Sequence, residues 1–251
     1  MGEKNIEYKS KQILEYYRSN RRTWDEFYPS ERWVFQKIAD EKGLLGDVLD
    51  VGCACGGLGA ALSCKFPLNS YTGIDINKDA IDWASRETRL QIPTRFTAGD
   101  IVCCASKEEY DVVASLSCVD WNIKTKDIIS ACWERVRPGG YFVSSLRLTS
   151  EKGVNNIKKS FQYVNFSGEE EDPEVANYVV FNVKEAMSAL SELDPAPTLI
   201  GAYGYWGSPS PTAVTLYDKL IFSVFYIKKG TEKPYPHEMA AELRLPLEAF
   251  L

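Results

Sequence analysis

The sequence predicts an α/β protein with a doubly wound, mostly parallel sheet. The stretch 48–62 has a β-prone run that is apolar except for Asp50, then a loop of small residues, then a helix. The segment 71–77, YTGIDIN, gives a second apolar strand that ends in Asp75. The segment TAGDI places Asp100 after a third strand. Three predicted strands therefore end next to three carboxylates.

The loop between the first strand and its helix is suited to a nucleoside ligand. Gly52, Ala54 and Gly56 remove side-chain bulk where a ligand approaches the backbone, and the helix start presents free N–H groups. The loop reads D-x-G-x-A-x-G, whereas a dinucleotide site reads G-x-G-x-x-G around a pyrophosphate. Asp75 is suited to bond both ribose hydroxyls, and Asp100 suits an adenine amino group.

These segments, with DVVASLS at 111–117 and RVRPGGYFVSSL at 135–146, resemble the class I S-adenosylmethionine-dependent methyltransferases. The resemblance covers residues 45–146. It implies a Rossmann-like sheet of seven strands with an antiparallel last strand. It also implies S-adenosyl-L-methionine as cofactor, S-adenosyl-L-homocysteine as product, and in-line methyl transfer to an oxygen or nitrogen atom of a small-molecule or sugar-bearing metabolite.

By this resemblance the glycine loop lies against the methionine part of the cofactor, Asp75 holds the ribose, and Asp100 with Ile101 holds the adenine. Ile76 packs on the adenine face. Ala54 departs from the family pattern, because it stands where the middle glycine is usual and adds one methyl group. The cofactor-binding residues are expected to be Asp50, Gly52, Cys53, Ala54, Gly56, Asp75, Ile76, Asp100, Ile101, Ser115 and Tyr28.

Two of the carboxylates also have a purely structural explanation. Asp75 fits the N-cap of the next helix, but Asn77 is better placed for that cap before KDAIDWASRE. This leaves Asp75 for a ligand. Asp100 fits an ordinary turn residue in A-G-D as well as an adenine contact.

The N-terminal segment is predicted to be helical and unusually aromatic. Its pattern breaks at Pro29, Ser30 is expected to cap the second helix, and that helix ends near Gly43. In the family, such helices often close over the cofactor, and an aromatic face can lie near the sulfonium charge. Packing onto the sheet explains most of the aromatic residues, and Tyr28 is the one expected at the cofactor.

After the fifth strand the chain is expected to carry a lid-like insertion, because the connection exceeds a usual strand-to-helix length. Asn182, with Glu185 in a capping box, begins the next helix. Final strands are predicted at 197–203 and 219–228, joined by a loop. The single domain 1–251 then divides into a helical cap (1–43), the cofactor-binding core (44–146), the insertion (147–182), the final helix and strand pair (183–230) and a tail (231–251) with a short helix.

Methyl transfer requires a general base only for some acceptors. A hydroxyl acceptor usually needs a carboxylate or a His within hydrogen-bond reach. Asp120, just past the fourth strand, is the expected catalytic residue, and it slightly favours an oxygen acceptor. The single histidine, His237, lies in the Pro-flanked tail and reads more simply as a surface residue. The substrate residues are expected to be Trp121, Tyr163, Tyr205 and Trp206.

Composition indicates a cytoplasmic enzyme, monomeric or homodimeric, with a small-molecule acceptor. The net charge of −6, from 29 basic and 35 acidic side chains, disfavours a nucleic acid partner, although Arg18, Arg21 and Arg22 form a local basic cluster. No stretch has the length of a membrane span, and the N-terminus has no apolar signal core. Seven cysteines and a single histidine indicate free thiols and no metal site.

Two alternatives from other classes stand beside this reading. An NAD-dependent oxidoreductase uses a similar fold, but Asp50 before the turn and the strand pair after the last helix argue against it. A methyltransferase-like subunit that binds cofactor and activates a partner, without catalysing, is disfavoured by the intact Asp50, Asp75 and Asp100.

Overall fold

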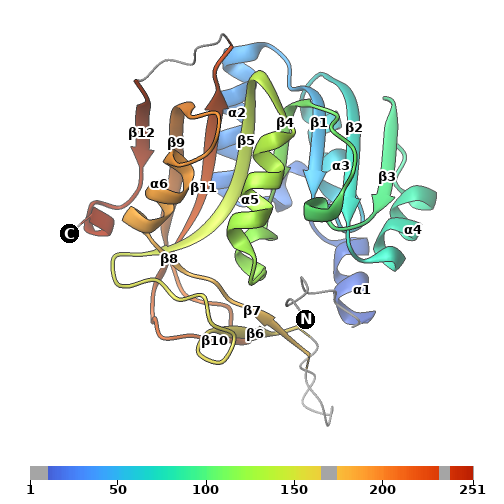
Figure 1. Ribbon diagram of the computed structural model, residues 1–251. Helices are drawn as coiled ribbons and strands as arrows, with labels where there is room; N and C mark the ends of the chain where they lie inside the picture. The colour runs from blue at the N-terminus through green and yellow to red at the C-terminus, as the bar shows by residue number, and fades with distance from the viewer. Residues whose placement is uncertain (1–10, 165–173, 232–237, 251) are drawn as a thin grey trace.

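A nine-stranded sheet forms the centre of the fold (Figure 1). The structure is a computed structural model that describes residues 11–164, 174–231 and 238–250. The strands are β1 (Gly46–Val51), β2 (Leu68–Asp75), β3 (Thr94–Ala98), β4 (Tyr110–Ser115), β5 (Val136–Thr149), β6 (Phe161–Tyr163), β7 (Val175–Asn177), β8 (Phe181–Asn182), β9 (Pro197–Gly207), β10 (Ala213–Val214), β11 (Leu220–Lys229) and β12 (Ala240–Arg244). The main sheet runs in the order β12-β9-β11-β5-β4-β1-β2-β3, and β8 pairs with β5.

The expected doubly wound sheet is confirmed, with β11 antiparallel to both β5 and β9. The sheet has nine strands where seven were expected. The tail contains a short 3-10 helix at Leu247–Phe250, but residues 240–244 before it form the strand β12, which was not expected and pairs in parallel with β9. The edge of β9 offers unpaired backbone groups, and β12 satisfies them. Part of the predicted loop after β9 is also extended, because β9 continues to Gly207.

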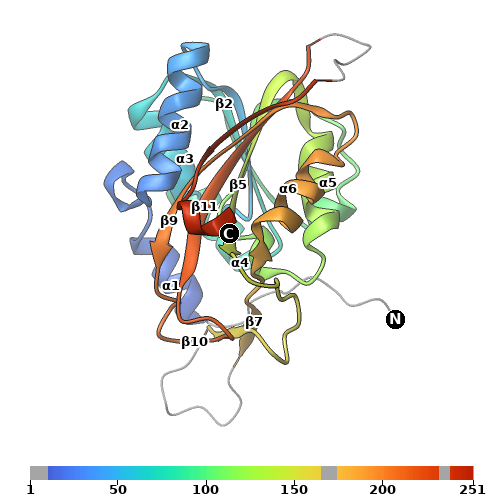
Figure 2. The ribbon, with the colours of Figure 1, turned by 90° about the vertical axis from the view of Figure 1, so that its left-hand side faces the viewer.

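Helices cover both faces of the sheet. They are α1 (Lys11–Ser19), α2 (Pro29–Lys42), α3 (Gly57–Lys65), α4 (Lys78–Glu87), α5 (Thr125–Glu134) and α6 (Val183–Ser191), with short 3-10 turns η1 (Trp24–Glu26), η2 (Ile101–Cys103), η3 (Val119–Trp121) and η4 (Leu247–Phe250). Figure 2 shows α2 and α3 on one face, and α5 and α6 on the other. Two apolar clusters fill these two interfaces, which explains why β1 and β4 are buried on both sides. Within the described ranges, none of the helices combines the length and apolar character that a bilayer crossing requires.

The helix caps follow the predictions with one correction. Asn77 accepts a hydrogen bond from Ala80 N at 2.9 Å, and Asn182 forms the capping box with Glu185. Ser30 does not cap α2. The N-cap is Tyr28, because Pro29, with its fixed φ, takes the first helical position.

A second, three-stranded sheet lies at the carboxyl edge of the main one. It pairs β10 with β6 and β6 with β7, and joins the insertion to the connection between β9 and β11. Figure 1 shows this small sheet and α1 below the carboxyl ends of the central strands. Both therefore stand over the strand ends that carry the predicted site. Part of the insertion, residues 165–173, is outside the described residues.

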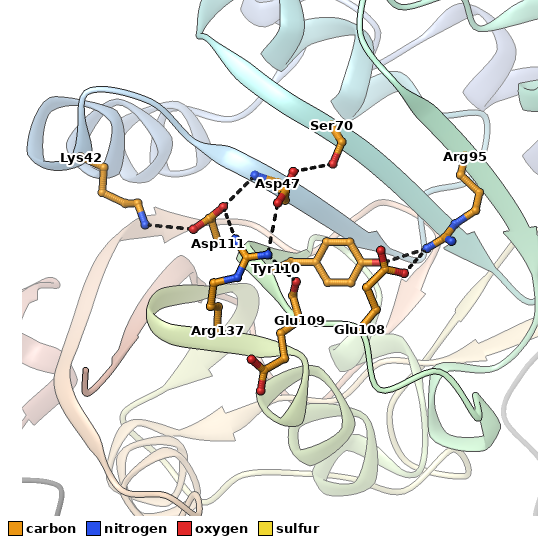
Figure 3. Close-up of polar contacts among 9 residues, drawn as sticks. All are labelled: Lys42, Asp47, Ser70, Arg95, Glu108, Glu109, Tyr110, Asp111 and Arg137. Atoms are coloured by element: carbon orange, nitrogen blue, oxygen red, sulfur yellow. Dashed lines mark hydrogen bonds and ion pairs between the residues drawn. The ribbon is translucent and has the colours of Figure 1, made fainter. Parts of the chain in front are cut away.

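The opposite, amino edge is tied together by a polar network (Figure 3). Asp111 Oδ2 accepts from Asp47 N at 2.9 Å and from Arg137 Nη1 at 2.8 Å. Arg137 Nη2 also lies 3.2 Å from Asp47 Oδ2, and Lys42 Nζ lies 3.7 Å from Asp111 Oδ1. Gly46 makes room for this carboxylate, because a Cβ there would come within 2.3 Å of it. One carboxylate thus connects β1, β4, β5 and α2.

We expect Asp111→Ala to lower the free energy of unfolding by about 1–2 kcal/mol, because Asp47 N and Arg137 both lose an acceptor. Urea denaturation followed by circular dichroism measures this change. Glu109→Ala is the matched control, since the Glu109 side chain is exposed and Arg137 contacts only its carbonyl oxygen. Equal stability of the two variants would contradict the assigned role of the network.

Candidate functional site

The glycine loop after β1 is folded back onto β2. Gly52 N and Cys53 N both donate to Ile74 O, at 2.8 and 3.2 Å. Gly52 has φ 78°, and a Cβ there would lie 2.7 Å from Cys118 Sγ, so the turn requires glycine. Ala54 also has positive φ, 45°, and its N–H donates to Asp75 Oδ2 at 2.8 Å. The left-handed conformation of Ala54 thus directs an amide toward the end of β2.

Asp75 is held from both sides. Its Oδ1 accepts from Asn77 N at 2.8 Å, while Oδ2 accepts from Ala54 N. Burial raises the pKa of Asp75, and these two amides counteract the rise. Asp75 lines a cavity, here called the Asp75 cavity, that runs between the loop, α4, η2 and α1; its walls include Gly52, Ala54, Ile76, Asn77, Asp100, Ile101, Ile13 and Trp121. Asp100 also accepts from Val102 N at 3.0 Å, so it caps η2 as well.

A second cavity lies on the other side of the loop, and we call it the Asp50 cavity. Its walls include Asp50, Cys53, Asn20 and Arg21. Asp50 is 3% exposed, and Tyr71 Oη donates to its Oδ2 at 2.5 Å. Burial raises the pKa of Asp50 to about 7, although Tyr71 opposes the rise. This carboxylate therefore changes its charge near neutral pH.

A third cavity of about 500 Å³ lies beneath the small sheet, and we call it the Arg147 cavity. Arg147 of β5 and Asp120 of η3 line it, together with Tyr28 and Glu31 from the start of α2. Side chains of α1, Gln162 of β6, the connection after β9 and residues 222–224 of β11 line the remaining sides. Its volume is that of a small-molecule site.

The three cavities meet at a few residues. Ser117 and Tyr17 line all three, and Ile13 and Trp121 line both the Asp75 and the Arg147 cavities. Ser117 follows β4 with φ 50°, and its N–H donates to Ser145 Oγ at 2.6 Å. The Asp75 and Arg147 cavities are therefore neighbours.

Asp120 lines the Arg147 cavity, next in the chain to Trp121. It is 3% exposed, its Oδ2 lies 3.4 Å from Arg147 Nη1, and burial raises its pKa while Arg147 lowers it. The other oxygen, Oδ1, is buried without a hydrogen-bond partner in the described part of the chain. The alternative base, His237, lies outside the described residues.

Several predicted cofactor contacts are placed differently. Ser115 is fully buried and donates to Val51 O at 3.2 Å, so it supports the turn from behind. Gly56 is the N-cap of α3 with φ 72°, and it lines none of the three cavities. Tyr28 lines the Arg147 cavity and neither of the other two.

Three of the predicted substrate residues do not line the Arg147 cavity. Gln162 lines it, so its strand neighbour Tyr163 points to the opposite face of β6. Tyr205 and Trp206 lie within the extended β9 and pair with β11, and Trp206 packs against the apolar core. Trp121 is the predicted substrate residue that does line it.

The sequence patterns do not identify Arg147 or Ser117 as site residues, and they place Arg21 only in a local basic cluster. Arg21 donates to the buried Glu31 at 2.8 Å and covers the rings of Phe27 and Tyr28. The positions of these residues follow from contacts between distant segments. The basic cluster was the one available signal, and it carried no information on burial.

Comparison with known proteins identifies the central segment. Residues 49–142 match the family model of a methyltransferase domain. A ubiquinone biosynthesis O-methyltransferase from Pseudomonas savastanoi pv. phaseolicola is 29% identical over 133 residues, 47% of this chain and 55% of that protein. A trans-aconitate 2-methyltransferase from Deinococcus radiodurans is 25% identical over 150 residues, 59% of this chain and 53% of that protein. The chain thus spans about half the length of these relatives.

Solved structures extend the likeness to most of the fold. An N-methyltransferase from Bradyrhizobium japonicum, in complex with S-adenosyl-L-homocysteine, has a TM-score of 0.53 at 16% identity, covering 87% of this chain and 97% of that one. An S-adenosylmethionine-dependent methyltransferase from Clostridium acetobutylicum has a TM-score of 0.53 at 14% identity, covering 81% and 93%. Residues 49–142 thus match a methyltransferase domain, and the fold around them is similar to that of solved S-adenosylmethionine-dependent methyltransferases.

Proposed function

We propose that this protein transfers the methyl group of S-adenosyl-L-methionine to an oxygen or nitrogen atom of a small molecule. The observation that carries the proposal is that the Asp75 and Arg147 cavities are adjacent, because Ser117, Tyr17 and Trp121 line both of them. One cavity has the side chains for a nucleoside, and the other has the size of a small acceptor. In-line transfer requires the cofactor and the acceptor to be bound next to each other, so the two cavities must be adjacent.

The residues of the Asp75 and Asp50 cavities fit this cofactor. Each carboxylate oxygen of Asp75 accepts one hydrogen bond from a backbone amide. Each oxygen therefore has a lone pair left to accept a hydrogen bond from a ribose hydroxyl. Ile76 and Ile101 offer apolar contact to an adenine ring beside Asp100. Asp50 lies at the other side of the loop, where a carboxylate would pair with the ammonium group of the methionine part. The cofactor supplies an activated methyl group when bound.

The chain itself orients the acceptor and excludes water. Trp121 and Tyr17 line both cavities, and Asp120 lines the Arg147 cavity as the candidate general base. We propose that it takes a proton from the acceptor, because its Oδ1 has no partner among the described residues. The enzyme is proposed to act in the cytoplasm as a monomer or homodimer, with its seven cysteines as free thiols.

Calorimetric titration with S-adenosyl-L-homocysteine, with NADH as the control ligand, tests the proposed cofactor. We expect binding of the first and none of the second. Binding of NADH alone would favour the oxidoreductase alternative. Binding of S-adenosyl-L-homocysteine, with no methyl transfer to any acceptor in a metabolite extract, would favour the non-catalytic alternative.

The titration of Asp50 gives a further prediction. Because the ionised form pairs with the ligand's ammonium group, the affinity for S-adenosyl-L-homocysteine is expected to rise as the pH increases through about 7. Below that value the rise approaches roughly tenfold per pH unit, the limit for one proton released. Calorimetry at several pH values measures it, and Asp50→Asn should remove the dependence. An equal slope in both proteins would show that Asp50 does not contact the ligand's charge.

A further inference from the structure

A buried guanidinium forms part of the wall of the Arg147 cavity. Arg147 is 6% exposed, and its Cζ lies 3.7 Å from the ring centroid of Tyr178 and 4.7 Å from that of Trp121. These two rings hold the plane of the guanidinium in place. Nη1 donates to Asp120 O at 2.9 Å, and Asp120 is its sole polar partner in the ranges that the structure describes. The remaining N–H donors are therefore available to a ligand.

Arg147 and Asp120 form a buried pair with zero net charge and spare hydrogen-bonding capacity. The ion pair is loose, 3.4 Å from Nη1 to Oδ2, and the second oxygen of Asp120 is buried and unpartnered. A buried polar atom without a partner costs free energy, and native structures rarely keep one without a role. A ligand that donates to Asp120 and accepts from Arg147 would satisfy both groups.

The pair of Arg147 and Asp120 also lies close to the cofactor side of the Arg147 cavity. Trp121, the residue after Asp120, lines both the Asp75 and the Arg147 cavities, so the pair lies in the Arg147 cavity next to a residue that borders the cofactor side. The segment after β7 fixes this arrangement, since Val179 N donates to Asp120 O at 2.9 Å and Tyr178 covers Arg147. The site is thus held before a ligand arrives.

We propose that Arg147 binds the negative oxygen of the acceptor, so that the acceptor of this enzyme is a hydroxyl group. This inference rests on the proposed methyl transfer and narrows its acceptor from oxygen or nitrogen to oxygen. The acceptor O–H bond breaks, its proton goes to Asp120 Oδ1, and the resulting oxyanion is paired with Arg147. The oxygen then forms the new bond to the methyl group as the bond from sulfur to that methyl breaks, and the proton later leaves Asp120 for solvent.

An amine acceptor fits the same pair poorly. As a neutral amine attacks a sulfonium methyl, positive charge develops on nitrogen, and a guanidinium at hydrogen-bond distance would repel it. With a hydroxyl, the developing charge is negative and the guanidinium stabilises it. Asp120 could take the proton from a hydroxyl or from an amine. Arg147 is therefore the residue that favours a hydroxyl acceptor over an amine.

Binding of 4-nitrophenol tests this inference without knowledge of the natural acceptor. Its phenolate has a visible absorption band that the neutral phenol lacks, so the spectrum reports the ionised form. We would titrate it into the Asp120→Asn variant saturated with S-adenosyl-L-homocysteine, because that variant leaves Arg147 without a competing carboxylate. We expect the phenolate to be bound, and the double variant Asp120→Asn/Arg147→Met to lose roughly 10- to 100-fold in affinity, as for a hydrogen bond to a charged group.

The controls separate this inference from the proposed function. The double variant carries a neutral pair, which buried sites often tolerate, and nitrobenzene, which cannot ionise, should bind both variants equally. Equal phenolate affinity in the two variants, binding of the neutral phenol, or no binding at all would overturn the role of Arg147. Failure of wild-type protein to bind S-adenosyl-L-homocysteine would instead overturn the proposed methyltransferase function.

Discussion

Asp120→Asn is expected to slow methyl transfer to a hydroxyl acceptor by roughly 10²- to 10⁴-fold, the usual contribution of a general base. The amide keeps the shape of the side chain and can still accept from Arg147, but it cannot take a proton. Asp120 does not line the Asp75 or the Asp50 cavity, so the affinity for S-adenosyl-L-homocysteine should stay the same. Turnover with tritiated cofactor and calorimetry measure the two quantities.

The role of Asp120 as a base also predicts how kcat/KM depends on pH. Burial raises the pKa of Asp120 above its ordinary value, against the opposing charge of Arg147. The base works only when ionised, so kcat/KM is expected to fall as the pH decreases through this raised pKa. Asp120→Asn should lack that limb, whereas Asp127→Asn, an exposed change at the start of α5, should retain it. Wild-type rates in Asp120→Asn would reduce Asp120 to a structural residue.

Asp75→Ala is expected to weaken the binding of S-adenosyl-L-homocysteine by about 2–6 kcal/mol. The carboxylate would bond two ribose hydroxyls, and each bond lost from a buried charged group costs about 1–3 kcal/mol. The loop loses order as well, because the amides of Ala54 and Asn77 both donate to Asp75 in this structure. Calorimetry measures the affinity.

Asp79→Ala is the matched control for this variant. Asp79 lies four residues later, in the first turn of α4, and its side chain is exposed. It should bind S-adenosyl-L-homocysteine as the wild type does. If Asp75→Ala also kept wild-type affinity, the ribose assignment would be wrong, whereas a loss in both variants would indicate damage to α4.

Local chemistry is what allowed the sequence to predict the core of this fold. The apolar run that ends at Val51, the small-residue loop and the caps at Asn77 and Asn182 are interactions within a few residues of chain, so their signals survive without tertiary information. The same holds for the carboxylates at the strand ends, since parallel strands bring their carboxyl ends to one edge. Asp50, Asp75 and Asp100 line the cavities at that edge.

Pairing between distant segments determines the edge strand β12 and the small sheet, which the sequence did not predict. The strand β12 forms because β9 has a free edge, and β10 joins β6 across about fifty residues of chain, which no local pattern encodes. The direction of Tyr163 depends on the register of that small sheet.

The sequence by itself therefore determined the doubly wound core and the strand-end carboxylates, because both follow from short-range periodicity and turn chemistry. Only the tertiary structure determined which side chains line the Arg147 cavity, the proposed acceptor site. Arg147 reads as an ordinary charged residue near a strand end until Tyr178 and Trp121 are seen to enclose its guanidinium beside Asp120. Burial of a charge depends on contacts made by all the segments around it, so it appears only when the chain is folded.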